Sequence, residues 1–166
     1  DMSVWPFSAS PRSTWVMVRV ESAEATGYGE LSDGGPVEQL VRAATSLREN
    51  LLGTTVAGAR TRLRQLVAER RQSAGPQETF LWSTVLGGVD SALADLTARI
   101  QGRPLSETLG LGAPVPVRAY ANINRRFGAS GADTVVREAV RAAGRGFGGV
   151  KIAPFSGEGA APLTAR

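Results

Sequence analysis

Lys151 is the residue in this sequence whose type is best suited to chemistry, because it is the only lysine among 166 residues. The other 18 basic residues are arginines, which stay protonated at any usable pH. Burial and neighbouring charges can instead tune a lysine into a base or a proton donor. The sequence contains neither histidine nor cysteine, so imidazole bases, thiol nucleophiles and thiolate metal sites are excluded within it. Catalysis by these residues would therefore use Lys151, carboxylates or hydroxyl groups. The alternative is a lone lysine on a surface loop with no chemical role.

The elements around Lys151 predict a strand–helix–strand unit. VRAYANIN (117–124) and GVKIA (149–153) are typical of strands, and ADTVVREAVRAAGRG (132–146) is typical of an amphipathic helix that ends in glycine. A helical crossover of this length implies that the two strands are parallel. A parallel sheet needs more than two strands and cover on both faces. We therefore expect the rest of this domain to follow Arg166.

The N-terminal part predicts an α+β domain. STWVMVRVES (13–22) and ATGYGELS (25–32) indicate a β-hairpin, in which Gly27 and Gly29 are expected to need unusual backbone angles. Apolar residues at helical spacing then predict three helices, over residues 37–52, 56–71 and 77–100. Gly87 and Gly88 interrupt the third helix and are expected to allow close packing against another element. The change of character near Ala113 divides the chain into two domains, 1–113 and 114–166.

Charge and hydropathy exclude two classes of partner. The net charge is +4, but the arginines are interleaved with Glu and Asp. The densest basic run, ARTRLRQLVAERR (59–71), has apolar residues at helical spacing, which indicates a solvated helix face rather than a nucleic-acid interface. No apolar run approaches the ~20 residues of a membrane helix, and residues 1–20 lack the pattern of a signal peptide. We expect a cytoplasmic protein that binds neither nucleic acid nor membrane.

Four motifs, in this order, connect the sequence to a known family. They are TGYGELSDGG (26–35), GGVDSALADLTARIQGRPLSETLG (87–110), VPVRAYANIN (115–124) and GFGGVKIAPF (146–155). Together they resemble the enolase superfamily, on the branch of mandelate racemase and muconate lactonizing enzyme. The resemblance implies an α+β capping domain over residues 1–113. The first strands of an α/β (TIM-type) barrel, incomplete in this chain, would then occupy residues 114–166.

The resemblance also implies a chemistry, namely removal of a proton α to a carboxylate with Mg²⁺ stabilising the enediolate. The family's three metal carboxylates come from later barrel strands, so no metal ligand is expected up to Arg166. Lys151 matches the first lysine of the family's Lys-x-Lys motif and is the expected catalytic residue, whereas Ala153 replaces the second. An alanine cannot take a proton, which disfavours racemisation by two opposed bases and favours dehydration of a sugar acid. A racemase, epimerase or cycloisomerase of the same superfamily, and a non-catalytic fragment or oligomerisation module, remain alternatives.

Further residues are expected to contact a small carboxylate substrate. Asn122 and Asn124 end the first barrel strand, where they would read sugar hydroxyls or else shape the following loop. Asp33 and Trp5 match positions in the loops that close over the substrate in this family, with Phe7 beside Trp5. Members of the family are usually homo-oligomers, and the same is expected here.

Overall fold

The computed structural model describes residues 1–10, 13–73, 75–112, 115–123 and 131–152. Its internal contacts separate two compact units, Asp1–Pro114 and Val115–Arg166. No helix in the described ranges is long and apolar enough to cross a membrane.

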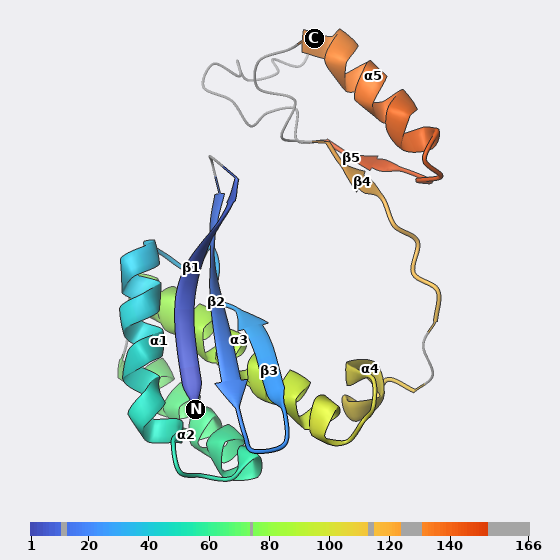
Figure 1. Cartoon of the computed structure of the whole chain (residues 1–166). Helices are drawn as coiled ribbons and strands as arrows, with labels where there is room; N and C mark the ends of the chain where they lie inside the picture. The colour runs from blue at the N-terminus through green and yellow to red at the C-terminus, as the bar shows by residue number, and fades with distance from the viewer. Residues whose placement is uncertain (11–12, 74, 113–114, 124–130, 153–166) are drawn as a thin grey trace. The chain divides into compact units, whose positions relative to one another are not determined.

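The first unit is built on an antiparallel sheet of three strands in the order β1-β2-β3 (Figure 1). The strands are β1 (Met2–Ser10), β2 (Ser13–Glu21) and β3 (Thr26–Glu30). Met2 pairs with Val20 across the first ladder, and Met17 pairs with Glu30 across the second. The predicted hairpin of β2 and β3 is confirmed. Strand β1 was not predicted, and it corrects the placement of Trp5 and Phe7, which lie in this strand rather than in a loop.

Strand β1 accommodates Pro6 because this residue occupies a position that forms no backbone hydrogen bonds with β2. Pro6 pairs with Val16, yet both backbone groups of Val16 are engaged on the β3 side. The Val16 N–H donates to Ser32 Oγ at 3.1 Å, and the Val16 carbonyl accepts from the Leu31 N–H at 2.8 Å. The nitrogen of Pro6 therefore faces the open edge of the sheet, where no bond to β2 is lost. An edge strand is the place in a sheet that accepts proline.

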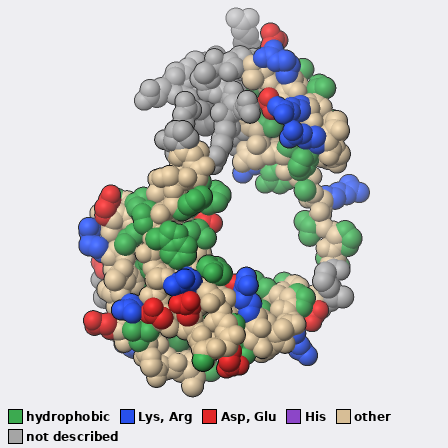
Figure 2. All heavy atoms as spheres, in the orientation of Figure 1, with side chains coloured by type: hydrophobic (Ala, Val, Ile, Leu, Met, Phe, Trp, Pro, Cys, Tyr) green, Lys and Arg blue, Asp and Glu red, His purple; other side chains and the backbone are tan. Residues whose placement is uncertain are grey.

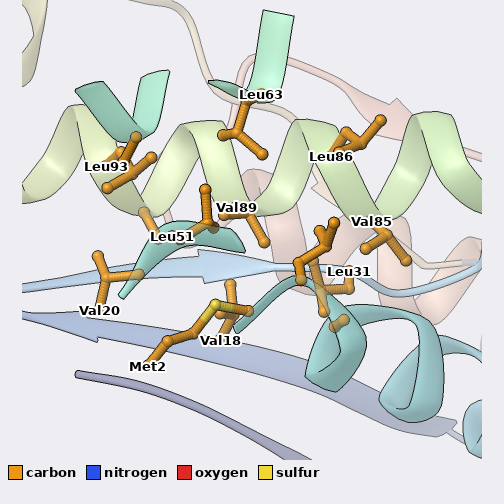
Figure 3. Close-up of a cluster of buried hydrophobic side chains, with 14 of the residues drawn as sticks. Met2, Val18, Val20, Leu31, Leu51, Leu63, Val85, Leu86, Val89 and Leu93 are labelled. Carbon is orange, nitrogen blue, oxygen red and sulfur yellow. The ribbon is translucent and has the colours of Figure 1, made fainter. Parts of the chain in front are cut away.

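Helices cover one face of this sheet and enclose the core (Figure 1). Their bounds are α1 (Val37–Leu51), α2 (Val56–Ser73), α3 (Pro76–Ile100) and the short α4 (Leu105–Thr108). The first three agree with the predicted helices to within two residues at each end. Helix α3 packs against β3 and β2, α1 packs against β1, and α2 packs against α3. The core between them has these largest fully buried side chains: Val16, Val18, Leu31, Leu40, Leu47, Val85 and Val89. Figure 3 shows several of them between the sheet and α3.

Glycines bring β3 and α3 into close contact. A Cβ on Gly27 would overlap the Ala92 carbonyl, and a Cβ on Gly29 would overlap the carbonyl of Gly88. Neither Gly27 nor Gly29 has a positive φ, so the expectation of unusual backbone angles was wrong. These two glycines are required by the close approach of the helix. Gly88 confirms the predicted close packing, whereas a Cβ on Gly87 would meet nothing within 4 Å.

The second unit contains the predicted strand–helix–strand order. Its elements are β4 (Ala121–Asn122), α5 (Gly131–Ala143) and β5 (Val150–Lys151). Strands β4 and β5 are parallel, with Ala121 beside Val150 and Asn122 beside Lys151. Both strands are shorter in the described residues than the predicted ranges 117–124 and 149–153. The parallel pairing itself is confirmed.

Candidate functional site

Lys151 and Asn122 are neighbours across the parallel strands of the second unit. The Ile123 N–H donates to the Lys151 carbonyl at 3.1 Å, and the Ala121 N–H donates to the Gly149 carbonyl at 3.0 Å. Partners in register on adjacent strands project to the same face of a sheet. The lysine and the amide predicted to contact substrate are therefore brought together on one face.

This face differs in character from the opposite one. Side chains alternate along a strand, so Asn122 and Lys151 face away from Ile123 and Val150. Ile123 is buried, whereas the side chains of Asn122 and Lys151 are exposed. Within the described residues Lys151 forms no ion pair that would neutralise its ammonium group. A charged donor and a neutral polar group side by side suit recognition of an anionic, hydroxylated molecule.

Some predicted residues of this face lie outside the described residues. They are Asn124 and Ala153. Their expected contacts, and the effect of alanine at the second lysine position, stay predictions.

Asp33 lies in the loop that joins β3 to α1. Its φ of 64° places it in the left-handed region, which aspartate tolerates better than most residues because its short side chain can bond locally. The side chain is exposed. The next residue, Gly34, is buried, and a Cβ there would meet the side chain of Thr84. The loop is thus held against α3 at Gly34 while Asp33 faces outward.

Trp5 lies on the outer face of the sheet, opposite the helices. It pairs with Met17, and its strand neighbour Phe7 pairs with Trp15. The Phe7 and Trp15 rings lie 6.4 Å apart between centroids and are tilted by 51°. All three aromatic side chains are exposed, Trp5 by 37 % and Phe7 by 51 %. Figure 2 shows hydrophobic side chains gathered over the hairpin of β1 and β2.

Asp33 and the aromatic hairpin lie at the same end of the first unit. Strand β3 pairs with β2 only as far as Met17, and the loop carrying Asp33 begins beside Val16. Beyond that level β2 continues to Ser13, paired with β1 alone. These residues belong to the first unit, whereas Lys151 and Asn122 belong to the second. That Asp33, Trp5, Asn122 and Lys151 contact one substrate stays a prediction.

The described residues do not hold a metal site. No group of three or more Asp, Glu, His or Cys side chains among them is placed to bind an ion. The donor set among the described residues does not fit Mg²⁺. The carboxylate of Asp95 has a structural contact instead, since its Oδ2 accepts the Tyr28 N–H at 3.0 Å and the Arg99 Nε–H at 2.9 Å.

Sequence reasoning missed a second cluster, which lies between α2 and α3. The arginines of α2 were interpreted as a solvated helix face, yet several have partners. Arg60 Nε lies 3.1 Å from Asp90 Oδ1, and the Arg70 guanidinium carbon lies 3.3 Å from the centroid of the Trp82 ring. No local sequence pattern connects Arg70 with Trp82, because the two residues lie on different helices. Only the packing of α2 on α3 brings them together.

Comparisons with known proteins agree with the resemblance. The family model "Mandelate racemase / muconate lactonizing enzyme, N-terminal domain" matches residues 4–110. No curated protein matches the chain. One similar solved structure is an enolase from Agrobacterium radiobacter with the provisional name galactarate dehydratase, bound to sodium and L-malate with an ordered active site. It is 24 % identical, has a TM-score of 0.76, and is matched over 94 % of this chain and 38 % of its own.

A second similar structure is a mandelate racemase/muconate lactonizing enzyme-like protein from Rubrobacter xylanophilus. It is 25 % identical with a TM-score of 0.72, over 92 % of this chain and 41 % of its own. The present chain thus spans about two fifths of the length of these neighbours. Because they cover 94 % and 92 % of this chain, both matches extend from the first unit into the second. Because the family model covers well over half of the sequence, the chain belongs to the mandelate racemase/muconate lactonizing enzyme family and contains its N-terminal domain.

Proposed function

We propose that the protein abstracts the proton α to the carboxylate of a small acid, and that the reaction is dehydration of a sugar acid. The observation that carries this proposal is the pairing of Asn122 with the lone lysine, Lys151, on one exposed strand face. An ammonium group would bind the carboxylate, and the amide would read a neighbouring hydroxyl. The provisional name of the Agrobacterium neighbour, and its bound hydroxy acid, are in keeping with this substrate class.

The proposed reaction balances without an external oxidant or reductant. A base removes the α-proton, and the electron pair of that C–H bond forms the new double bond as the β-hydroxyl leaves. The hydroxyl takes a proton from an acid and departs as water, and the resulting enol tautomerises to a 2-oxo acid. Lys151 would stabilise the negative charge that develops on the carboxylate oxygens, which is the charge that limits removal of such a weakly acidic proton.

The remaining assignments rest on family membership. We propose residues 1–113 as the capping domain and 114–166 as the beginning of the barrel domain. Dependence on Mg²⁺, a homo-oligomeric state and a cytoplasmic location stay predictions. Asp33 and Trp5 are proposed, on the resemblance to the family, as substrate-binding residues of the capping domain.

The test compares Lys151→Ala and Lys151→Arg with the unaltered enzyme, as intact protein incubated with aldonic and aldaric acids and MgCl₂. Product is measured as 2-oxo acid by reaction with semicarbazide. Exchange of the α-proton is measured in D₂O by ¹H NMR. We expect Lys151→Ala to lower kcat/KM by about 10²-fold or more, as for the loss of one donor to a developing oxyanion. Lys151→Arg keeps the positive charge but replaces the compact ammonium with a guanidinium. Its kcat/KM should lie between those of the wild type and Lys151→Ala.

The matched control is Arg141→Ala, which removes an exposed cation from α5. It should leave kcat/KM unchanged. Wild-type activity in Lys151→Ala would refute the assigned role of the lysine. Deuterium exchange without 2-oxo acid would replace dehydration by racemisation or epimerisation, and neither exchange nor product with any acid would refute the proposed chemistry.

A further inference from the structure

A groove between α2 and α3 has the features of a ligand site. Its volume is about 290 Å³, near the lower end of the range for small-molecule pockets. Leu63 and Val67 form its α2 wall, and Trp82 and Leu86 form its α3 wall. Gly87 lines it as well, and the absence of a side chain there leaves space that no other atom fills within 4 Å.

Arg70 gives the groove an incompletely satisfied cation. Its guanidinium stacks on the Trp82 ring, with 3.3 Å from Cζ to the ring centroid. The Arg70 Nε–H is shielded from solvent and has no hydrogen-bond partner in the described part of the chain. Glu78 lies 3.8 Å away, between Oε1 and Arg70 Nη1, which is beyond hydrogen-bond distance. The Nε–H is thus closed to a ligand in the groove, whereas the Nη groups end a side chain that is 32 % exposed and can donate to an acceptor there.

The other charges of the groove also favour an anion. Asp90 lines it, but its carboxylate is paired with Arg60 at 3.1 Å. Arg64 lines the same groove and has no ion pair among the described residues. Arg64 and Arg70 both line this groove, together with the apolar side chains of Leu63 and Val67.

We propose that this groove binds a small carboxylate with a planar, apolar body. The carboxylate accepts hydrogen bonds from the Arg70 Nη groups and from Arg64. The body lies against Leu63, Val67 and Leu86, where the open position at Gly87 makes room for it. Planarity is favoured because the stacked Arg70 and Trp82 present a flat wall. This site is separate in residues from the one proposed around Lys151, and its test uses binding rather than activity.

The experiment is a titration of the intact protein with benzoate, followed by ¹H–¹⁵N NMR of the tryptophan indoles. The sequence has three tryptophans, and Trp5 and Trp15, on the outer face of the sheet, act as internal controls. We expect a saturable shift of the Trp82 signal with a dissociation constant on the order of 1 mM, as suits a ligand of few heavy atoms. Benzamide and benzamidine have the same shape without the negative charge, and should produce no saturable shift.

Variants distinguish recognition of the negative charge from nonspecific apolar binding. Arg64→Gln and Arg70→Gln should each weaken benzoate binding by about tenfold, the usual effect of losing a charged hydrogen bond. Glu78→Gln removes the carboxylate that competes for Arg70 and should tighten binding. Arg62→Gln is the matched control on the same helix, since Arg62 pairs with Glu69 outside the groove, and it should bind as the wild type does. Gly87→Leu fills the open position and should abolish binding.

Three outcomes would overturn the proposal. They are the absence of a saturable Trp82 shift with benzoate, equal binding of benzamidine, and unchanged binding in both Arg64→Gln and Arg70→Gln. If Arg70→Gln fails to fold, Arg64→Gln and Glu78→Gln still decide, because both change exposed side chains and must move affinity in opposite directions.

Discussion

Two adjacent glycines of α3 should respond in opposite directions to the same substitution. Gly87 is exposed, and an added Cβ would meet nothing within 4 Å. Gly88 is buried, and an added Cβ would overlap Leu31 Cδ2 and the Glu30 carbonyl oxygen and lie 3.0 Å from the Glu30 carbonyl carbon. The helix is the same and the residues are neighbours, so contact with the sheet is the main difference between the two sites.

The magnitudes follow from these contacts. Alanine is favoured over glycine inside a helix by ~1 kcal/mol, and at Gly87 nothing opposes this gain. At Gly88 the same gain is offset by overpacking. Such overpacking costs ~1–3 kcal/mol in cores, and the upper value applies because one of the clashing groups is backbone. We therefore expect Gly87→Ala to stabilise by about 1 kcal/mol and Gly88→Ala to destabilise by about 2 kcal/mol.

Thermal unfolding followed by circular dichroism measures both variants. For a unit of this size ~1 kcal/mol corresponds to a change in Tm of roughly 4 °C. Gly87→Ala should then melt about 4 °C above the wild type and Gly88→Ala about 8 °C below it. Equal melting temperatures for the two variants would refute the close approach of α3 to β3. A loss of stability in Gly87→Ala would refute the open space at that position.

Three further predictions concern the stability of the fold. Asp95→Ala removes the acceptor of the Tyr28 N–H and should lower the free energy of unfolding by about 1–2 kcal/mol in urea denaturation, whereas Asp95→Asn keeps a side-chain oxygen and should lose less. Asp33→Gly relieves the left-handed backbone at φ 64° and should not lower Tm; a clear decrease would mean that the aspartate side chain holds its loop. Val18→Ala in the fully buried core should cost about 2 kcal/mol, whereas Val136→Ala, 60 % exposed on α5, should change stability by less than about 0.5 kcal/mol.

The parts of the fold that the sequence predicted are those in which local pattern and tertiary environment agree. Val16, Val18 and Val20 lie on the buried face of β2 and alternate with Trp15, Met17, Arg19 and Glu21, none of which is buried. Strand β1 was missed because Pro6 interrupts it and few of its residues are β-branched. Its pairing depends on β2 and on the open edge, which a local pattern does not contain. For the same reason Gly27 and Gly29 were assigned to unusual angles instead of to a close helix contact.

The candidate site was predictable to a similar degree. The strand–helix–strand order predicted the parallel pairing, whereas the register that places Asn122 beside Lys151 was established only by the structure. The groove at Arg70 and Trp82 was not predictable, because it needs the two helices side by side. The sequence of a basic, amphipathic helix does not by itself indicate which of its arginines stack on an aromatic ring of another helix.

The proline in β1 has a consequence for the behaviour of the protein in concentrated solution. The outer strand of an open sheet offers its free N–H and C=O groups as a template for strands of other molecules, which is a route to aggregation. Pro6 presents no N–H on that side, so an incoming strand would lose a bond halfway along β1. The exposed aromatic side chains of Trp5, Phe7 and Trp15 would otherwise favour association of other molecules at this edge. Proline thus allows the hairpin to display apolar rings while discouraging fibre growth along its backbone.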